Sequence, residues 1–306
     1  MASIRPMSVL ACPACKSDGL AGGPPAGWRC DECGAEYPVI DGVGRFLAPD
    51  RAAYYEAFLR DYTAVRHAEG RAGHDADFYR RLPEPTPGDP LFEQWRMRSV
   101  SWRALQRRVV GRLARAAVVV DVGAGVGWLS NRAASMGLHA IAIDLSVDPD
   151  DGLGAVPRYA VGFEAHQAEM AALPVRSGVA DVVVFNASVH YATDLAAVMA
   201  EARRVLRPGG SVVVMDSPIY RRAADGAAMI AERHADFERR FGTRSDSVPS
   251  IGFLTIAGLR AATPELEWSR HRPWYGWRWA LKPWRARLRG RRAPSRFELL
   301  IGKVRA

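Results

Sequence analysis

The chain has 306 residues, of which 48% are hydrophobic and 25% are charged, and its formal net charge is +9. That apolar content is sufficient for a sizeable core and excludes a wholly disordered chain. No apolar run reaches the roughly 18 residues of a membrane span, and the first ten residues lack the apolar stretch of a secretion signal. We therefore expect no transmembrane segment and a cytoplasmic location.

The four cysteines stand in two pairs near the start of the chain. Cys12 and Cys15 form one C-x-x-C, and Cys30 and Cys33 form the other. Two such knuckles converge on a tetrahedral site, and thiols stay reduced in the cytoplasm, so the spacing predicts one structural Zn²⁺. Four thiolates complete the coordination and leave no position for a catalytic water. We expect residues 1–48 to form a zinc ribbon that metal binding folds.

Two segments rich in aromatic residues and arginine follow the predicted ribbon. Residues 52–67 and 94–113 have the pattern of helices, and the proline-rich stretch 83–90 separates them. We therefore expect residues 49–116 to be a helical cap or linker ahead of the first buried strand.

A buried strand, a glycine loop and a helix start are predicted in series at residues 117–130, AVVVDVGAGVGWLS. The alternate glycines let the backbone turn close to a ligand, which the helix N-terminus also faces. A dinucleotide motif would place its third glycine at Trp128. Asp121 would repel a diphosphate but attract a cation, and Asp144, ending the next strand, can accept hydrogen bonds from a ribose. One acid for an amino group and one for a sugar suits S-adenosylmethionine.

Three further segments extend this pattern in order: QAEMAALP at 167–174, DVVVFNASVH at 181–190 and EARRVLRPGGSVVV at 201–214. With them, residues 117–216 resemble the S-adenosylmethionine-binding core of class I methyltransferases of the type 11-like group. The resemblance implies an α/β fold: a seven-stranded, doubly wound, Rossmann-like sheet with a helical cap over the cofactor. We expect the cofactor to be bound by Asp121, Gly123, Ala124, Gly125, Asp144, Leu145, Glu169, Met170 and Asn186, with Tyr54, Tyr55, Tyr62 and Arg66 of the cap near the acceptor. The segment YPVIDGVGRFL at 37–47 in turn resembles the Trm112-like zinc ribbons.

The catalytic residue is the least determined part of the prediction. A sulfonium is already a good leaving group, so methyl transfer depends mainly on holding the acceptor in line with the methyl. His190, at the end of the predicted fourth strand, could take a proton from an acceptor hydroxyl. The alternative is that this histidine has no role in the chemistry.

Residues 217–306 are expected to complete the methyltransferase domain and to carry an acceptor-side insertion. Between Arg270 and Arg292 stand eight arginines, one lysine and no acid, together with four tryptophans. This segment could be a solvated connector between antiparallel strands at 266–275 and 297–304. It could instead bind nucleic acid by stacking and phosphate contacts, or an anionic membrane surface.

Three functions remain open on the sequence alone. The first is methyl transfer to a small-molecule or lipid-linked acceptor, which the helical cap favours. The second is an RNA methyltransferase that uses the ribbon and the basic segment. The third is a non-catalytic cofactor-binding scaffold, which the intact acids and glycines of the cofactor motif disfavour.

Overall fold

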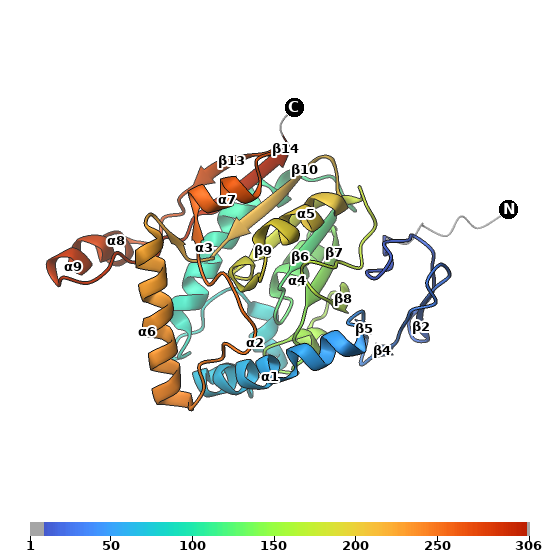
Figure 1. Ribbon diagram of the computed structural model, residues 1–306, viewed down its shortest axis with the longest axis horizontal. Coiled ribbons are helices and arrows are strands. Elements are labelled where there is room, and N and C mark those ends of the chain that lie inside the picture. Colours follow the sequence, from blue (N-terminus) through green and yellow to red (C-terminus); the bar gives the residue numbers. More distant parts are fainter. Residues whose placement is uncertain (1–8, 305–306) are drawn as a thin grey trace.

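A nine-stranded mixed sheet forms the centre of the computed structural model, which describes residues 9–304. Figure 1 shows this sheet with helices on both faces. The six strands from β5 to β10 in the sheet order run parallel, and β4, β14 and β13 are antiparallel to their neighbours. The order is β13 (Leu266–His271), β14 (Leu299–Val304), β10 (Leu206–Met215), β9 (Ala180–Asn186), β6 (Val118–Val122), β7 (His139–Asp144), β8 (Glu164–Gln167), β5 (Val43–Arg45) and β4 (Val39–Ile40).

The strand order reverses direction between β6 and β9. From β6 the chain proceeds through β7 to β8 on one side, and it then crosses to β9 and β10 on the other side. In doubly wound sheets a crevice opens at such a reversal, beyond the carboxyl ends of the strands. The glycine loop follows β6 directly, so this fold places the loop in the crevice.

Alternate valines of the central strands pack into two separate apolar clusters, one on each face. Val119, Val182 and Val213 face the helices α3 (Phe92–Arg108) and α4 (Trp128–Ser135). Val120, Val183 and Val212 face α5 (Leu195–Val205) and α7 (Ile256–Ala262). Side chains alternate across a strand, so the valines of these strands are buried on both faces of the sheet, as expected for a parallel sheet.

The helical segment ahead of β6 is present, with shifted ends. It begins with α1 (Pro49–Arg66) and a π-helical turn at His67–Arg71. Helices α2 (Ala76–Arg81) and α3 follow, and a short 3-10 helix at Val110–Arg112 ends the segment. Helix α1 contacts α6 (Ala223–Phe241), which follows β10. The short strands β11 (Ile219–Tyr220) and β12 (Leu254–Thr255) pair on either side of α6 in the sequence.

The N-terminal segment is joined to the main domain through a shared core. Its strands β1 (Leu20–Gly23), β2 (Gly27–Cys30) and β3 (Glu36–Tyr37) form a small antiparallel sheet. Trp28, Tyr37 and Phe46 belong to the same buried cluster as Leu173 and Val175 of the main domain. The strands β4 and β5 then extend the large sheet beside β8. The predicted seven strands are present, and these two make nine, because residues 39–45 pair with the exposed edge of β8.

The predicted antiparallel pair at the C-terminal end is confirmed as β13 and β14. Between them the chain forms two short helices, α8 (Trp277–Ala280) and α9 (Lys282–Leu288). These helices project away from the domain at the left of Figure 1. Among residues 9–304, none of the helices combines the length and the apolar character needed to cross a membrane.

Candidate cofactor and acceptor site

The glycine loop is closely packed between β6 and the end of β9. Gly123 has a φ of +72°, and a Cβ added there would lie 2.2 Å from the Cβ of Ser188. Gly125 has a φ of +55°, and its amide donates a hydrogen bond to Asp144 Oδ2 at 2.8 Å. Both positions need the left-handed conformation that glycine adopts at little cost. The loop is thereby tied to the carboxyl end of β7.

Asp144 holds the turn that follows β7. Its Oδ1 accepts a hydrogen bond from the amide of Ser146 at 2.8 Å, while its Oδ2 accepts the Gly125 amide. Burial raises the pKa of this carboxyl, although both amides favour its charged form. Each oxygen keeps a second lone pair, so the carboxylate can also accept hydrogen bonds from a ligand.

Two acceptor oxygens at the carboxyl ends of β6 and β9 are buried and have no hydrogen-bond partner within the described part of the chain. They are Asp121 Oδ1 and Asn186 Oδ1. The other Asp121 oxygen accepts a hydrogen bond from Ser130 Oγ at 3.0 Å. Burial, and to a lesser degree the charge of Asp144, raises the pKa of Asp121 to about 7. A buried acceptor without a partner is costly, so its presence beside a cavity indicates a site for a donor or a cation.

A cavity with about 920 Å³ of empty space, its open mouth included, lies against the glycine loop. Seven of the nine predicted cofactor residues line it: Gly123, Ala124, Gly125, Asp144, Leu145, Met170 and Asn186. Tyr62 and Arg66 of α1 also line it, as predicted for the cap, and Ser146, Asp151, Phe58, Trp95 and Arg98 do so without having been predicted. Phe58 lies on α1, and Trp95 and Arg98 lie on α3. Only the folded chain brings these two helices against the loop, so no local pattern identified these three.

Two predicted cofactor residues lie outside this wall. Asp121 is buried just before the loop and is not part of the lining. Glu169 instead holds the cap in place: its carboxylate binds Arg51 at 2.6 Å and Tyr55 Oη at 2.7 Å. Tyr54, on the outer side of α1, is exposed. Glu169 therefore contributes by fixing α1 over the cavity.

His190 lies in a short 3-10 helix at Val189–Tyr191, beyond the end of β9. Its side chain is buried, its Nδ1 is 3.3 Å from Ser217 Oγ, and it lines neither of the cavities described here. Burial, together with the positive charges of Arg233 and Arg66, lowers the pKa of this imidazole to about 3. The ring is therefore neutral at physiological pH, and its role in catalysis stays a prediction.

The cavity contains an unusual number of arginines. Arg66 and Arg71 are paired with Glu69 and with Asp151. Arg98 has no carboxylate partner within hydrogen-bond distance among the described residues, and its guanidinium lies 4.9 Å from the ring centroid of Trp95. Burial, with Arg71 as the next cause, lowers the pKa of Arg98 to about 10. The Arg98 guanidinium lines the cavity, where the charges of Asp216 and Asp151 act on it, and it can bind an anionic group.

A second cavity shares a wall with the first. Phe58, Tyr62, Arg66 and Tyr191 line both. The far side of the second cavity is supplied by α6 and the loop after it. Ile230, Phe237 and Val248 give this side apolar surface, and Arg233 and Arg244 give it positive charge. Arg244 is paired with Asp246 at 3.0 Å, whereas Arg233 forms no ion pair among the residues that the structure describes.

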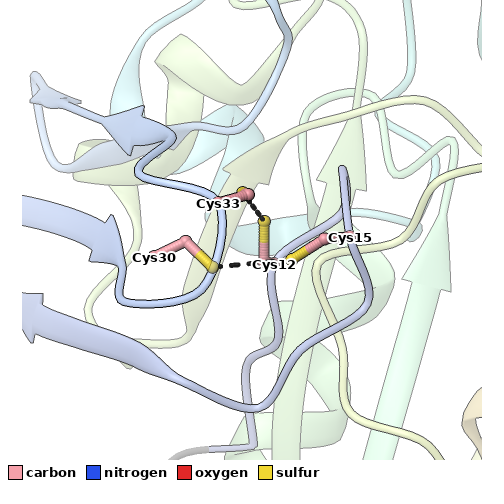
Figure 2. A group of neighbouring side chains, drawn as sticks. All are labelled: Cys12, Cys15, Cys30 and Cys33. Carbon is pink, nitrogen blue, oxygen red and sulfur yellow. Dashed lines mark hydrogen bonds between the residues drawn. The ribbon is translucent and has the colours of Figure 1, made fainter.

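The four cysteine sulfurs converge at one point of the N-terminal segment (Figure 2). Cys12 Sγ is 3.7 Å from Cys33 Sγ, Cys15 Sγ is 3.6 Å from Cys30 Sγ, and all four lie within 4.8 Å of one another. Zn–S bonds of about 2.3 Å at tetrahedral angles would separate two sulfurs by about 3.8 Å. The spacing of the sulfurs therefore fits a tetrahedral four-thiolate metal centre.

Charged contacts fasten this cysteine segment to α5 and to the loop before β9. Lys16 Nζ is 2.7 Å from Glu201 Oε1, and Arg176 is 2.6 Å from Asp18 Oδ2. Glu201 also accepts the amide of Leu173 at 2.8 Å. Burial would raise the pKa of Glu201, but hydrogen bonds from Arg204 and Lys16 outweigh it and lower that pKa. The cysteine cluster therefore lies in a segment that is built into the main domain.

Fold and cavity together define a doubly wound α/β domain with a ligand site at its switch point. Residues 120–214 match the family model described as a methyltransferase domain. The chain is 33% identical over 101 residues to the malonyl-[acyl-carrier protein] O-methyltransferase of Hahella chejuensis, and 36% identical over 115 residues to the dimethylglycine N-methyltransferase of Parasynechococcus marenigrum. These matches cover 31% and 36% of this chain, and 34% and 40% of the two relatives. The chain thus spans well under two thirds of the length of these relatives.

Solved methyltransferase structures share the fold over a larger part of the chain. The geranyl diphosphate C-methyltransferase of Streptomyces coelicolor A3(2) superposes with a TM-score of 0.52, at 16% identity, over 82% of this chain and 98% of that chain. A geranyl diphosphate methyltransferase in complex with SAM superposes with a TM-score of 0.50, at 18% identity, over 72% and 93% of the two chains. At such identities the likeness shows the fold, which is Rossmann-like. The family match and this fold support a class I methyltransferase.

Proposed function

We propose that the protein is an S-adenosylmethionine-dependent methyltransferase that acts on a small-molecule or lipid-linked acceptor. The observation that carries the proposal is the pair of adjacent cavities, one against the glycine loop after β6 and the other between α1 and α6. The first cavity has the acid Asp144 and the unpartnered oxygen of Asn186, and both suit a cationic nucleoside. The second offers a separate space for an acceptor, and Phe58, Tyr62 and Tyr191 line both cavities.

The residues of the first cavity fit this cofactor. Asp144 can accept hydrogen bonds from the ribose hydroxyls, and Leu145 and Met170 supply apolar surface beside the adenine. Asn186 Oδ1 supplies an acceptor that lacks a partner within residues 9–304, and the nearby Asp121 supplies negative charge. When bound, S-adenosylmethionine supplies an electrophilic methyl group on a positively charged sulfur.

The chain contributes to the reaction mainly by positioning the two reactants. Holding an acceptor atom in line with the methyl–sulfur bond can supply about 7–11 kcal/mol of the barrier in favourable cases. Helix α1, fixed by Glu169 through Arg51 and Tyr55, covers one side of the site. The proposal needs no general base, and neutral His190 is not on either wall.

The second cavity favours an acceptor that has an apolar body and an anionic group. Ile230 and Phe237 supply apolar surface, and Arg233 supplies a guanidinium without an ion-pair partner in the described chain. The relatives are named for malonyl-[acyl-carrier protein], dimethylglycine and geranyl diphosphate, and all three of these carry an acidic group. These relatives give no support to RNA as the acceptor. For the N-terminal segment we propose a structural Zn²⁺ on Cys12, Cys15, Cys30 and Cys33.

Calorimetry with S-adenosylmethionine tests the cofactor site. Asp144→Ala should weaken binding about tenfold or more, because charged hydrogen bonds to the ribose are lost. Glu267→Ala is the matched control, since Glu267 is exposed on β13, far from the loop in the sheet order. Unchanged affinity in Asp144→Ala would refute the site.

Labelled S-adenosylmethionine with fractionated cell extract tests the acceptor class. Label should enter small or lipid-linked anionic molecules, and Arg233→Gln should raise the KM for that acceptor while cofactor affinity is unchanged. Arg103→Gln, at an exposed position of α3, is the control. Label found only in RNA would overturn the acceptor proposal, and absence of both cofactor binding and transfer would favour the scaffold alternative.

A further inference from the structure

The segment between β13 and β14 forms a projecting helical arm, which we define as residues 274–289. Backbone hydrogen bonds link the two helices of the arm at Leu281, which donates to Trp277 O at 3.0 Å and accepts from Arg285 at 3.0 Å. The helices α8 and α9 are therefore successive turns of nearly continuous helix. In Figure 1 they extend beyond α6, away from the sheet.

One face of the arm is apolar and open to solvent. Trp277, Leu281, Trp284 and Leu288 follow one another at intervals of three or four residues, which places them on the same side of a helix. Their exposed fractions are 76%, 43%, 64% and 68%, and the neighbouring Trp274 is 59% exposed. Soluble proteins rarely leave such a contiguous apolar stripe uncovered without a function.

The arm is anchored to the domain, although its apolar stripe is exposed to solvent. Trp279, on the other side of the arm, stacks on Phe297 with ring centroids 5.3 Å apart, and Lys282 Nζ lies 3.8 Å from the centre of the Trp279 ring. Arg96 of α3 donates a hydrogen bond to the carbonyl oxygen of Tyr275 at 3.0 Å. One face of the arm therefore contacts the domain, and the opposite face is exposed to solvent.

The charge around the stripe is of one sign. No acid occurs from Arg270 to Arg292. Arg270 and Arg272 at its start share the one carboxylate of Glu298, and Arg292 at its end is paired with Glu232. The cations of the arm and its end have no ion-pair partner in the described part of the chain: Arg278, Lys282, Arg285, Arg287, Arg289 and Arg291. The free positive charge therefore surrounds the apolar stripe.

We propose that the arm docks the protein on the surface of an anionic lipid bilayer. Tryptophan and leucine would enter the boundary between headgroups and acyl chains, while the long basic side chains reach the lipid phosphates. Single-stranded RNA fits less well, because leucines alternate with tryptophans along the stripe and offer no ring for base stacking. A second copy of the chain would bring like charges together, which opposes self-association.

Docking by the arm would also bring the second cavity towards the membrane. Arg292, just after the arm, is 2.7 Å from Glu232 of α6, and the same helix carries Ile230 and Arg233 into the cavity wall. This consequence rests on the proposed function, and it favours a lipid-linked acceptor over a freely soluble one. The docking itself does not depend on the protein being an enzyme.

Co-sedimentation of the full chain with phosphatidylcholine vesicles, with and without phosphatidylglycerol, tests the proposal. We expect binding to be about tenfold or more tighter with the anionic lipid, because each basic residue near the surface contributes. Raising the salt from about 0.1 M to about 1 M should weaken it, because the screening length falls from about 10 Å to about 3 Å. The double variant Trp277→Ala/Trp284→Ala should lose about tenfold or more through lost apolar burial.

Ile40→Ala removes an exposed apolar side chain at the far edge of the sheet and is the matched control. Calorimetry with S-adenosylmethionine shows whether the arm variants remain folded and keep the cofactor site. Equal binding to neutral vesicles, or no binding to either, would overturn the proposal while leaving the proposed function untouched. It would also be overturned if the arm variants lost RNA binding or dimerisation, measured by gel shift and ultracentrifugation, without losing vesicle binding.

Discussion

Replacing Asp121 by asparagine is expected to stabilise the fold and to weaken cofactor binding at the same time. Asparagine keeps the size of the side chain and an oxygen that can accept the Ser130 hydrogen bond. It removes a carboxylate that is 1% exposed and has one oxygen without a partner within the described residues. The protein thus keeps a destabilising charge where a cationic ligand would benefit from it.

The pKa of Asp121 gives the size and the sign of the stability effect. Burial raises this pKa from 3.8 to about 7, which corresponds to at most about 4 kcal/mol. Below pH 3.8 the carboxyl is protonated in the folded and the unfolded chain, so it costs nothing. As the pH rises towards 7, the unfolded chain releases its proton first, and stability is lost until the folded chain ionises as well.

Urea unfolding of both proteins at about pH 5 and about pH 8 measures the effect. The advantage of Asp121→Asn should grow by about 2–3 kcal/mol between these values. Asp31→Asn is the control, because Asp31 is exposed and forms no side-chain ion pair in the described chain. Calorimetry should show that Asp121→Asn binds S-adenosylmethionine more weakly than the wild type. The affinity of the wild type should fall below pH 7, where Asp121 becomes protonated, and the affinity of the variant should not. An advantage that does not change with pH, together with unchanged affinity, would refute the reasoning.

Two further predictions concern the glycine loop and the cysteines. Gly123→Ala should lower the free energy of unfolding, measured in urea, by more than about 1 kcal/mol, because it strains a φ of +72° and places a methyl group 2.2 Å from Ser188 Cβ. Gly162→Ala is the control and should be tolerated, because a Cβ there meets no atom within 4 Å. Equal stability of the two variants would contradict the packing described for the loop. The purified protein should contain one zinc per chain, and a chelator should lower its Tm by about 5 °C or more and expose Trp28, detected by its fluorescence. A metal-free protein with an unchanged Tm would exclude the structural zinc.

Much of the site could be predicted because it is local in the sequence. The strand, glycine loop and helix at 117–130 are consecutive, and the acid at 144 ends the next strand, so periodicity and spacing were sufficient to place them together. The cysteine pairs are likewise defined by spacing alone, and their sulfurs converge as predicted. Glu169 shows the limit of this reasoning: its position follows the family pattern, yet its carboxylate is occupied by Arg51 and Tyr55.

The residues that were missed come from contacts between distant parts of the chain. Arg98 and Trp95 reach the cavity only because α3 packs on one face of the sheet beside the loop. The two extra strands arise because residues 39–45 meet the open edge of β8. The basic segment left three alternatives open in the sequence, since only the folded structure separates the arginines that are paired from those that surround an exposed apolar stripe.

The sequence by itself determined the fold class, the position of the cofactor loop and the cysteine cluster, because each depends on residues a few positions apart whose backbone preferences act locally. Tertiary structure alone decided the wall of the second cavity, the packed position of His190 and the direction in which the arm faces. These depend on which side chains from separate helices share one space, and on which charges find a partner. Local backbone preferences therefore define the site proposed for the methyl donor. Packing between distant parts of the chain defines the surfaces proposed to bind the acceptor and the membrane.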